Sequence, residues 1–260
     1  MFDTITIDRD GRGIARLTLN RPDKHNMLSG QMIEELTRAA QILGEDPAVR
    51  VVLLAAEGPS FCAGGDLGWR KAQIGADAAT RRAAATALAM MLRALDLMPK
   101  PLIGRVQGAA YGGGVGLMSV CDLTVGVSGT QFGLTETRLG LIPATIGPYV
   151  IARIGAAAAR RHMLGARLFA AEEALRIGLL SHLVAPGDLE AAVLAEAESF
   201  LLCAPGAVAD AKALIRESAP APDAALIDKT VGLLAKRWDS AESTEGIAAF
   251  FDRRKPDWAL

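Results

Sequence analysis

A run of three glycines, residues 112–114, is the segment of this chain whose composition most directly suggests chemistry. It follows a short apolar run at residues 101–106, which predicts a buried strand, and precedes a small, apolar helix that reaches Cys121. Glycine lets a ligand approach bare backbone, so the segment can offer N–H groups to an oxygen that gains negative charge. It is neither a dinucleotide loop, because Leu117 replaces the last glycine, nor a P-loop, because no Lys follows. A closely packed turn is the alternative interpretation.

A second glycine loop, residues 61–66, also follows a predicted buried strand. If the two strands are parallel neighbours, the two loops could direct two backbone N–H groups at one oxygen. Such an oxyanion hole is worth roughly 3–4 kcal/mol per donor. Asp66 ends this loop, and we expect it to cap the N-terminus of a helix rather than to act in catalysis.

Glu136 is the acid with the strongest claim to a chemical role. Its apolar flanks within residues 131–143 predict partial burial, which raises the pKa of a carboxyl group and suits it to proton transfer near neutral pH. The alternative is a salt bridge with Arg138, which would lie on the same side of an extended chain.

The composition of the 260 residues fits one large domain, or one domain with a small appendage, since 51% of them are apolar. A net charge of −1 gives no field that would favour nucleic acid or an anionic membrane. The longest uncharged stretch, residues 106–121, is shorter than the roughly 18 residues that span a bilayer. Three cysteines and three histidines, all far apart, predict no metal site, and the N-terminus lacks a signal-peptide core. We therefore expect a cytoplasmic protein.

Strands and helices alternate in the first two-thirds of the chain, and helices alone follow. Strands are predicted at residues 4–8, 14–20, 49–56, 101–106 and 122–127, and helices at 29–43, 80–98, 147 onward, 187–203, 205–217, 222–238 and 242–252. This order predicts an α/β core over residues 1–195 and a helical C-terminal region over residues 196–260.

Together these segments resemble the enoyl-CoA hydratase/isomerase (crotonase) family. The resemblance covers nearly the whole chain and rests on residues 17–26, 61–67, 107–114, 121–123, 132–143, 245–250 and 254–256. It implies a spiral of β-β-α units that forms two nearly perpendicular sheets. It also implies a C-terminal helical region that builds homotrimers, which often pair into hexamers.

The resemblance assigns roles to particular residues. The N–H groups of Gly65 and Gly113 would hold the thioester carbonyl of an acyl-CoA, and Glu136 would move a proton at the enolate that forms. Coenzyme A would enter as part of the substrate, with no covalently bound cofactor and no metal.

Other residues would bind the coenzyme A part or the acyl part of the substrate. In the family, backbone near Ala63 and Leu67 meets the adenine, and Lys24 lies where the phosphates pass, as does Arg21. Asp66, Tyr111 and Gly116 complete the predicted binding residues. Arg253, Arg254 and Lys255 would reach the coenzyme A of a neighbouring subunit. For every basic residue, the alternative is a solvated surface charge.

One position departs from the family pattern. A hydratase with two glutamates has the first of them two residues after the third glycine, where this chain has Gly116. Glu136 matches the second. Several isomerases of the family also keep only the second, because moving a double bond needs one proton shuttle. Simple hydration of an unsubstituted enoyl-CoA is therefore in doubt.

A finer resemblance, over residues 111–117, 135–144 and 146–150, is to bacterial hydratases of leucine and acyclic-terpene breakdown. These enzymes act on 3-methylglutaconyl-CoA and isohexenylglutaconyl-CoA, which carry a second carboxylate. We hypothesise that this carboxylate, Tyr111 or Tyr149 positions water in place of the missing glutamate. Arg70, Lys71 or Arg138 would pair with it.

Three functions remain open at this stage. The first is hydration of a branched, carboxylated enoyl-CoA, and the second is enoyl-CoA isomerisation by Glu136 alone. The third is a non-catalytic relative that binds acyl-CoA or RNA. The balanced charge argues against broad RNA binding, and the retained Glu136 argues against a loss of catalysis.

Overall fold

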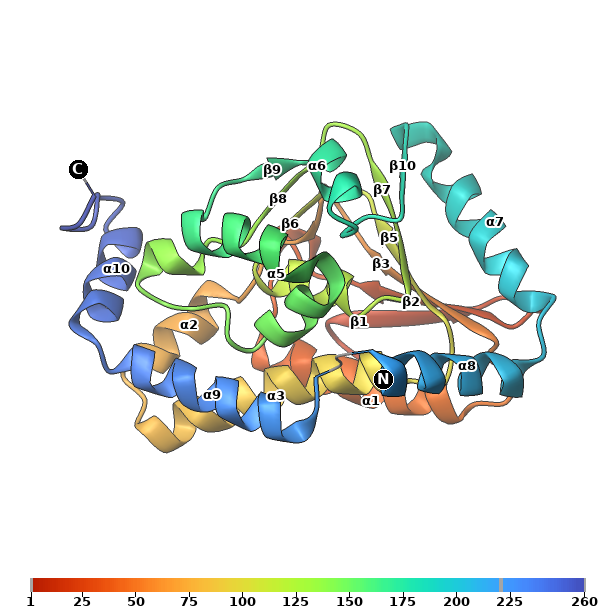
Figure 1. Ribbon diagram of the computed structural model, residues 1–260, viewed down its shortest axis with the longest axis horizontal. Helices are drawn as coiled ribbons and strands as arrows, with labels where there is room; N and C mark the ends of the chain where they lie inside the picture. The colour runs from red at the N-terminus through yellow and green to blue at the C-terminus, as the bar shows by residue number, and fades with distance from the viewer. Residues whose placement is uncertain (1, 220–221, 260) are drawn as a thin grey trace.

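Two mostly parallel β-sheets form the centre of the protein, in a computed structural model that describes residues 2–219 and 222–259 apart from the side chain of Arg70 (Figure 1). The larger sheet has the order β1-β2-β3-β5-β7-β10, with β1 antiparallel to β2 and the other neighbours parallel. Its strands are β1 (Ile5–Arg9), β2 (Ile14–Leu19), β3 (Val51–Ala56), β5 (Leu102–Val106), β7 (Leu123–Val127) and β10 (His182–Val184).

The smaller sheet is built from strands of two or three residues in the order β4-β6-β8-β9. They are β4 (Ser60–Cys62), β6 (Ala109–Tyr111), β8 (Gln131–Gly133) and β9 (Phe169–Ala170). The first three are parallel, and β9 closes the sheet antiparallel to β8. The carboxyl ends of β4, β6 and β8 therefore lie along one edge.

The chain winds through these sheets as a spiral. The pairs β3–β4, β5–β6 and β7–β8 each give one strand to the larger sheet and the next to the smaller sheet, after which the chain enters helical structure. The predicted α/β spiral of β-β-α units is confirmed.

Helices cover both sheets and continue to the C-terminus. They are α1 (Gly30–Glu45), α2 (Leu67–Ile74), α3 (Ala78–Leu97), α4 (Gly113–Ser119), α5 (Gly147–Gly165), α6 (Ala171–Arg176), α7 (Leu189–Leu201), α8 (Pro205–Ser218), α9 (Ala224–Trp238) and α10 (Ala241–Phe251). Short 3-10 turns are η1 (Pro22–Lys24), η2 (Glu136–Leu139) and η3 (Pro186–Asp188). Figure 1 shows α9 beside α3, and α10 at the end of the molecule near the C-terminus. Within the described chain no single helix is long and apolar enough to cross a membrane, although the bent pair Pro186–Leu201 and Pro205–Ser218 passes that test by length and composition.

Strand β3 shows why the larger sheet is buried on both faces. Val52 and Leu54 belong to the main core, which α1 and α3 help to build. Val51 and Leu53 face the other way, into a second cluster that α7 covers with Leu189 and its neighbours. Because successive side chains of a strand point to opposite faces, an unbroken apolar run is needed here.

Most of the predicted long elements are present, within a few residues of their expected ends. Ser29 caps α1 as expected, accepting a hydrogen bond from the Met32 N–H at 3.2 Å. The prediction that strands are confined to the first two-thirds was wrong, because β10 begins at His182. The short strands of the smaller sheet were also missed, since two or three residues are too few to show a periodic pattern. Helix α2 was missed as well. Helix α7 crosses the predicted boundary at residue 195.

Candidate active site

The two glycine loops lie side by side because the strands before them are parallel neighbours. Strand β4 pairs with β6, with Ser60 opposite Ala109 and Cys62 opposite Ala110. A Cβ built on Gly113 would lie only 3.8 Å from the Cα of Gly64. The loops therefore meet at one edge of the smaller sheet, which is the arrangement that two N–H groups need if they are to share one oxygen.

The N–H group of Gly65 faces away from the backbone that holds the loop. Leu28 forms a parallel bridge with Gly65, in which the Leu28 N–H donates to Gly64 O at 2.8 Å and the Asp66 N–H donates to Leu28 O at 2.9 Å. These bonds use the residues that flank Gly65, so its own N–H points to the opposite side. Gly65 lines the cleft described below.

Gly113 supplies the second N–H group. It is the first residue of α4, and the N–H groups in the first turn of a helix have no acceptor within the helix. Gly113 lines the same cleft as Gly65. Two backbone donors from different loops therefore border one cleft.

Close packing explains why the run consists of glycines. Gly112 has φ 48° and ψ −111°, and a Cβ there would lie 2.7 Å from Glu136 Oε1. A Cβ on Gly114 would lie 2.2 Å from the carbonyl oxygen of Cys62. The close packing expected under the alternative interpretation is therefore present, and it brings Glu136 against the backbone beside Gly113.

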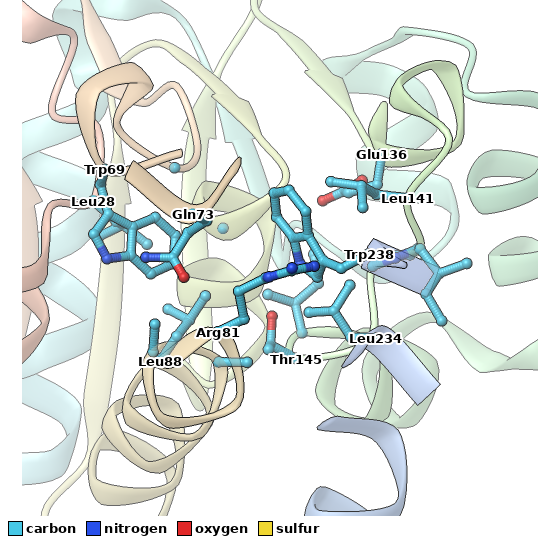
Figure 2. Close-up of a pocket in the computed structure, with 17 residues that line it drawn as sticks. Leu28, Trp69, Gln73, Arg81, Leu88, Glu136, Leu141, Thr145, Leu234 and Trp238 are labelled. Atoms are coloured by element: carbon cyan, nitrogen blue, oxygen red, sulfur yellow. The ribbon is translucent and has the colours of Figure 1, made fainter. Parts of the chain in front are cut away.

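Glu136 begins η2, is half-buried, and lines the cleft with Gly65 and Gly113. Figure 2 shows its carboxylate directed into the cleft. The Leu141 N–H donates to Glu136 O at 3.1 Å, and Arg237 Nε of α9 donates to Gly140 O at 2.7 Å. The C-terminal helices thus hold the turn that carries Glu136.

The rest of the cleft surface is mostly apolar. Its walls come from α2, α3, η2 and the segment after it, and α9, and include Leu28, Trp69, Leu88, Leu141, Leu234 and Trp238 (Figure 2). Among the described side chains on this surface, Glu136 is the one carboxylate and Arg81 the one cation. Gln73 and Thr145, both buried, are further polar side chains there.

Arg81 and Gln73 were not found from the sequence. Arg81 is adjacent to Arg82 in an alanine-rich helix, and no pattern distinguishes the two. In the structure Arg81 reaches into the cleft, while Arg82 forms an ion pair with Asp228. Only the packing of α9 against α3 separates their roles.

Asp66 caps α2, as predicted. Its Oδ1 accepts hydrogen bonds from the N–H groups of Gly68 at 2.9 Å and Trp69 at 3.1 Å, and its Oδ2 pairs with Arg21 at 3.0 Å. Burial alone would raise the pKa of Asp66, but the hydrogen bonds from Trp69 and Arg21 outweigh it and hold this pKa below its ordinary value. Asp66 is therefore a charged anchor for α2, which carries Trp69 to the cleft.

Gly116 lies behind the cleft wall. A Cβ at this position would be 2.6 Å from Ile146 Cγ2 and 3.6 Å from Leu92 Cδ1. Ile146 itself lines the cleft. The space into which a side chain at position 116 would extend is therefore filled by a hydrocarbon group.

The two tyrosines considered for water positioning lie elsewhere. Tyr149 is buried, its hydroxyl donates to Ala89 O at 3.4 Å, and burial raises the pKa of its phenol. It lines a separate cavity beside α8. Tyr111 is half-buried, with Cδ1 at 3.3 Å from a Cβ built on Gly133. The Tyr149 prediction was wrong, and Tyr111 lies outside the described lining of the cleft.

The residues expected along coenzyme A lie at the outer side of the second glycine loop. Lys24 is exposed, with its Nζ 4.0 Å from Asp23, and Leu67 is 39% exposed. The Ala63 N–H donates to His25 O at 3.0 Å, which fixes the loop against η1.

The other basic residues considered from the sequence lie in different surroundings. Lys71 and Arg138 are exposed and lie outside the described lining of the cleft, and the side chain of Arg70 lies outside the described residues. Arg254 pairs with Glu245, a hydrogen bond that lowers the pKa of Glu245 to about 2. The exposed Arg253 has φ 55°.

This arrangement suits proton transfer next to a carbonyl group. Backbone donors stabilise an oxyanion, and a carboxylate moves the proton. Thiol chemistry is disfavoured because burial raises the pKa of Cys62 to about 12, which keeps it protonated. Over residues 2–219 and 222–259 no group of three or more His, Cys, Asp or Glu side chains has the arrangement of a metal site.

Comparison with known proteins agrees with this geometry. The enoyl-CoA hydratase/isomerase family model matches residues 9–259. Methylglutaconyl-CoA hydratase of Rattus norvegicus is 30% identical over 266 residues, covering 96% of this chain and 80% of that protein. The crystal structure of an enoyl-CoA hydratase from Mycobacterium avium superposes with a TM-score of 0.86 at 31% identity and full coverage of both chains. AtuE of Pseudomonas aeruginosa gives a TM-score of 0.81 at 37% identity, covering 99% of this chain and 100% of that chain.

Proposed function

The chain belongs to the enoyl-CoA hydratase/isomerase family, and we propose that it adds water to a branched enoyl-CoA thioester of the 3-methylglutaconyl-CoA type. One observation carries this proposal: Glu136 lines the same cleft as Gly65 and Gly113 and is the one described carboxylate there. The 30% identity to a methylglutaconyl-CoA hydratase supports the choice of substrate.

The proposed reaction uses the backbone for charge and Glu136 for the proton. The thioester carbonyl accepts hydrogen bonds from Gly65 and Gly113, which stabilise the enolate that forms when water oxygen bonds to the β-carbon. Glu136 takes the proton released by that water and delivers it to the α-carbon as the carbonyl reforms. The sum is addition of one water across the double bond, and Glu136 ends as it began.

The coenzyme A part of the substrate would lie along the outer side of the second glycine loop. Lys24, exposed beside that loop, would face the phosphates, and backbone near Ala63 and Leu67 would meet the adenine. Coenzyme A then enters and leaves with each substrate, and no other cofactor takes part.

Isomerisation is the second candidate, and one observation favours it. Ile146 fills the space beside Gly116, so the site has one described carboxylate where a hydratase with two glutamates has a pair. Moving a double bond needs one proton acceptor that also returns the proton, and Glu136 alone meets this requirement.

A substrate panel on the purified protein separates the candidates. We expect 3-methylglutaconyl-CoA to lose its conjugated-thioester absorbance with a gain of one water in mass, whereas isomerisation leaves the mass unchanged.

Glu136→Gln should lower kcat about 1,000-fold, because general acid–base catalysis contributes about 100- to 10,000-fold. Glu34→Gln, an exposed change on α1, is the control. Full activity of Glu136→Gln on every substrate would refute the assignment, and binding without turnover by the unchanged protein would indicate a non-catalytic relative.

The chain is also proposed to assemble as a homotrimer or as a hexamer of paired trimers. An apolar groove between α5 and α9 supports this, because its lining includes the exposed Ile151, Leu226 and Leu233. A second copy would cover such a surface. Sedimentation velocity gives the mass directly, and a monomer at micromolar concentration would contradict the proposal.

A further inference from the structure

Gln73 presents a polar group without a partner to the cleft. It lies on α2, is 7% exposed, and lines the apolar wall opposite η2. Its Oε1 is buried and has no hydrogen-bond partner among the described residues. Figure 2 shows Gln73 beside Trp69 at one side of the view, with Arg81 between them and Trp238. Buried polar groups in proteins are nearly always paired, so this one points to a ligand.

Arg81, on α3, places a permanent charge on the same surface. Its Nε donates to Ala76 O at 3.0 Å and its Nη1 donates to Asp239 Oδ1 at 3.0 Å. Its guanidinium carbon lies 5.9 Å from the centroid of the Trp238 ring. These contacts fix the guanidinium in place, and Nη2 takes part in neither hydrogen bond. Arginine stays charged at every pH at which proteins are folded.

We propose that Arg81 and Gln73 bind a carboxylate at the far end of the acyl chain. This inference rests on the proposed function and identifies the part of the site that would select a dicarboxylic acyl group. The carboxylate would accept hydrogen bonds from Arg81 and from the Gln73 amide, whose oxygen and nitrogen exchange places by a half-turn of the side chain. An alkyl end would leave both polar groups facing hydrocarbon.

The chemistry of the wall favours a carboxylate over other polar ends. Arg81 is a donor only, so its natural partner is an acceptor, and a charged acceptor binds a cation more strongly than a neutral one. The surrounding surface is apolar, with Leu88, Leu234 and Trp238, which strengthens such a pair by excluding water. Of the cations considered from the sequence, Lys71 and Arg138 are exposed outside this wall, and the side chain of Arg70 lies outside the described residues.

Binding of two unreactive thioesters tests this subsite without relying on catalysis. Glutaryl-CoA and valeryl-CoA have the same chain length and differ in the terminal carboxylate. Calorimetric titration should show that the unchanged protein prefers glutaryl-CoA. Arg81→Met should reduce that preference about 100-fold, because a site built to pair with a polar group rejects its absence strongly. Arg81→Lys should restore the preference for glutaryl-CoA about tenfold relative to Arg81→Met, because lysine supplies a point charge. Gln73→Glu should lower the affinity for glutaryl-CoA by charge repulsion and leave the affinity for valeryl-CoA unchanged.

Two matched variants separate a binding role from a structural one. Arg82→Met changes the neighbouring arginine, which pairs with Asp228 on the surface, and should leave the preference unchanged. Asp239→Asn removes the ion pair that ties Arg81 to the end of α9 but keeps the guanidinium, so the preference should largely persist. The proposal is overturned if the unchanged protein binds both thioesters equally, or if Arg81→Met weakens both alike.

Turnover separates failure of the subsite from failure of the proposed function. If the protein prefers glutaryl-CoA through Arg81 yet hydrates no enoyl-CoA, the subsite stands and the hydratase assignment falls. If it hydrates 3-methylglutaconyl-CoA and 3-methylpent-2-enoyl-CoA, which has a methyl group in place of the carboxylate, at equal kcat/KM, the subsite falls and the hydratase assignment stands.

Discussion

The two walls of the cleft are built in different ways. The glycine wall, formed by the loops around Gly65 and Gly113, presents backbone N–H groups that two paired strands fix in position. The helical wall, formed by α2, α3 and α9, presents the side chains of Gln73, Arg81 and Trp238. The backbone of the glycine wall can stabilise charge in any thioester, whereas the side chains of the helical wall suit one kind of acyl group. Under the proposed function, reaction type and substrate choice would therefore belong to separate parts of the fold.

Glu136 stands between the walls and depends on both. Its carboxylate packs against Gly112 of the glycine wall. The turn that carries it is held from the other side by Arg237 of α9, through Gly140. Because both walls support Glu136, disturbing either support should lower activity. Disturbing the substrate-facing side chains of the helical wall should instead change substrate selectivity.

Among changes to the supports of Glu136, the largest effect is expected from Gly112→Ala. The new methyl group would lie 2.7 Å from Glu136 Oε1, at a backbone φ of 48° that L-residues rarely adopt, so Glu136 has to move. We expect kcat to fall about 100-fold, the lower range of what a proton-transfer group contributes. Steady-state kinetics with the best substrate of the panel measures it.

Gly129→Ala is the matched control for that change. Gly129 also has a positive φ, 81°, but a Cβ there meets nothing within 4 Å. It should cost about 1 kcal/mol of stability through backbone strain and leave kcat unchanged. Equal kinetic losses in both variants would show that strain, and not displacement of Glu136, is responsible.

A smaller effect is expected from Gly246→Ala, which acts on the helical side. Its Cβ would lie 2.6 Å from the carbonyl carbon of Leu139 and push α10 away from η2. We expect a loss of about 1–3 kcal/mol in the free energy of unfolding, typical of overpacking. Displacement of η2 should also reduce kcat about tenfold, by weakening proton transfer from Glu136. Gly206→Ala, in open space on α8, is the control. Unchanged kcat for Gly246→Ala would show that α10 does not position Glu136.

The space beside Gly116 offers a third test. Gly116→Glu alone meets Ile146 and should destabilise the fold by about 1–3 kcal/mol without a gain in activity. Combined with Ile146→Ala, it should raise hydration of crotonyl-CoA about tenfold over Ile146→Ala alone, because a second proton-transfer group becomes available. No gain in the double variant would mean that the missing glutamate is not what limits this substrate.

The glycine wall was predictable from the sequence and the helical wall was not. The two glycine loops and the capping role of Asp66 follow from local patterns, since parallel strands bring their following loops together and an acid before a helix caps it. The family resemblance then selects Gly65 and Gly113 within these loops. Arg81 lies on α3, which packs against α9, a helix that is distant in the chain. Gln73 lies on α2, which α9 faces across the same cleft. No local sequence pattern predicts which of two adjacent arginines a distant helix will cover.

The same contrast applies at Gly116 and Tyr149. The family pattern showed that an acid is absent at position 116, but only packing shows that Ile146 fills the space. Tyr149 belongs to a segment with a finer resemblance, yet its hydroxyl bonds to Ala89 beside another cavity. Motifs predict which groups react, and three-dimensional packing decides what surrounds them.

The smallest effect concerns Asp66, which joins the two walls because it ends the glycine loop and caps α2. Its pKa is lowered in the folded protein, so its charge contributes stability above the unfolded pKa of about 3.9, and this is lost as pH falls through the folded value. Asp66→Ala should cost about 1 kcal/mol at pH 7, typical of a lost cap. Urea unfolding at pH 7 and near pH 3 should show that this difference shrinks in acid.

Asp66→Asn separates the cap from the ion pair. Asparagine still accepts from the N–H groups of Gly68 and Trp69 but carries no charge for Arg21. It should retain most of the stability at pH 7 and lose most of the pH dependence that Asp66 adds. Asp23→Asn, an exposed carboxylate on η1, is the control. A pH-independent cost of Asp66→Ala would show that the charge contributes nothing, and that the glycine loop and α2 are joined by the cap alone.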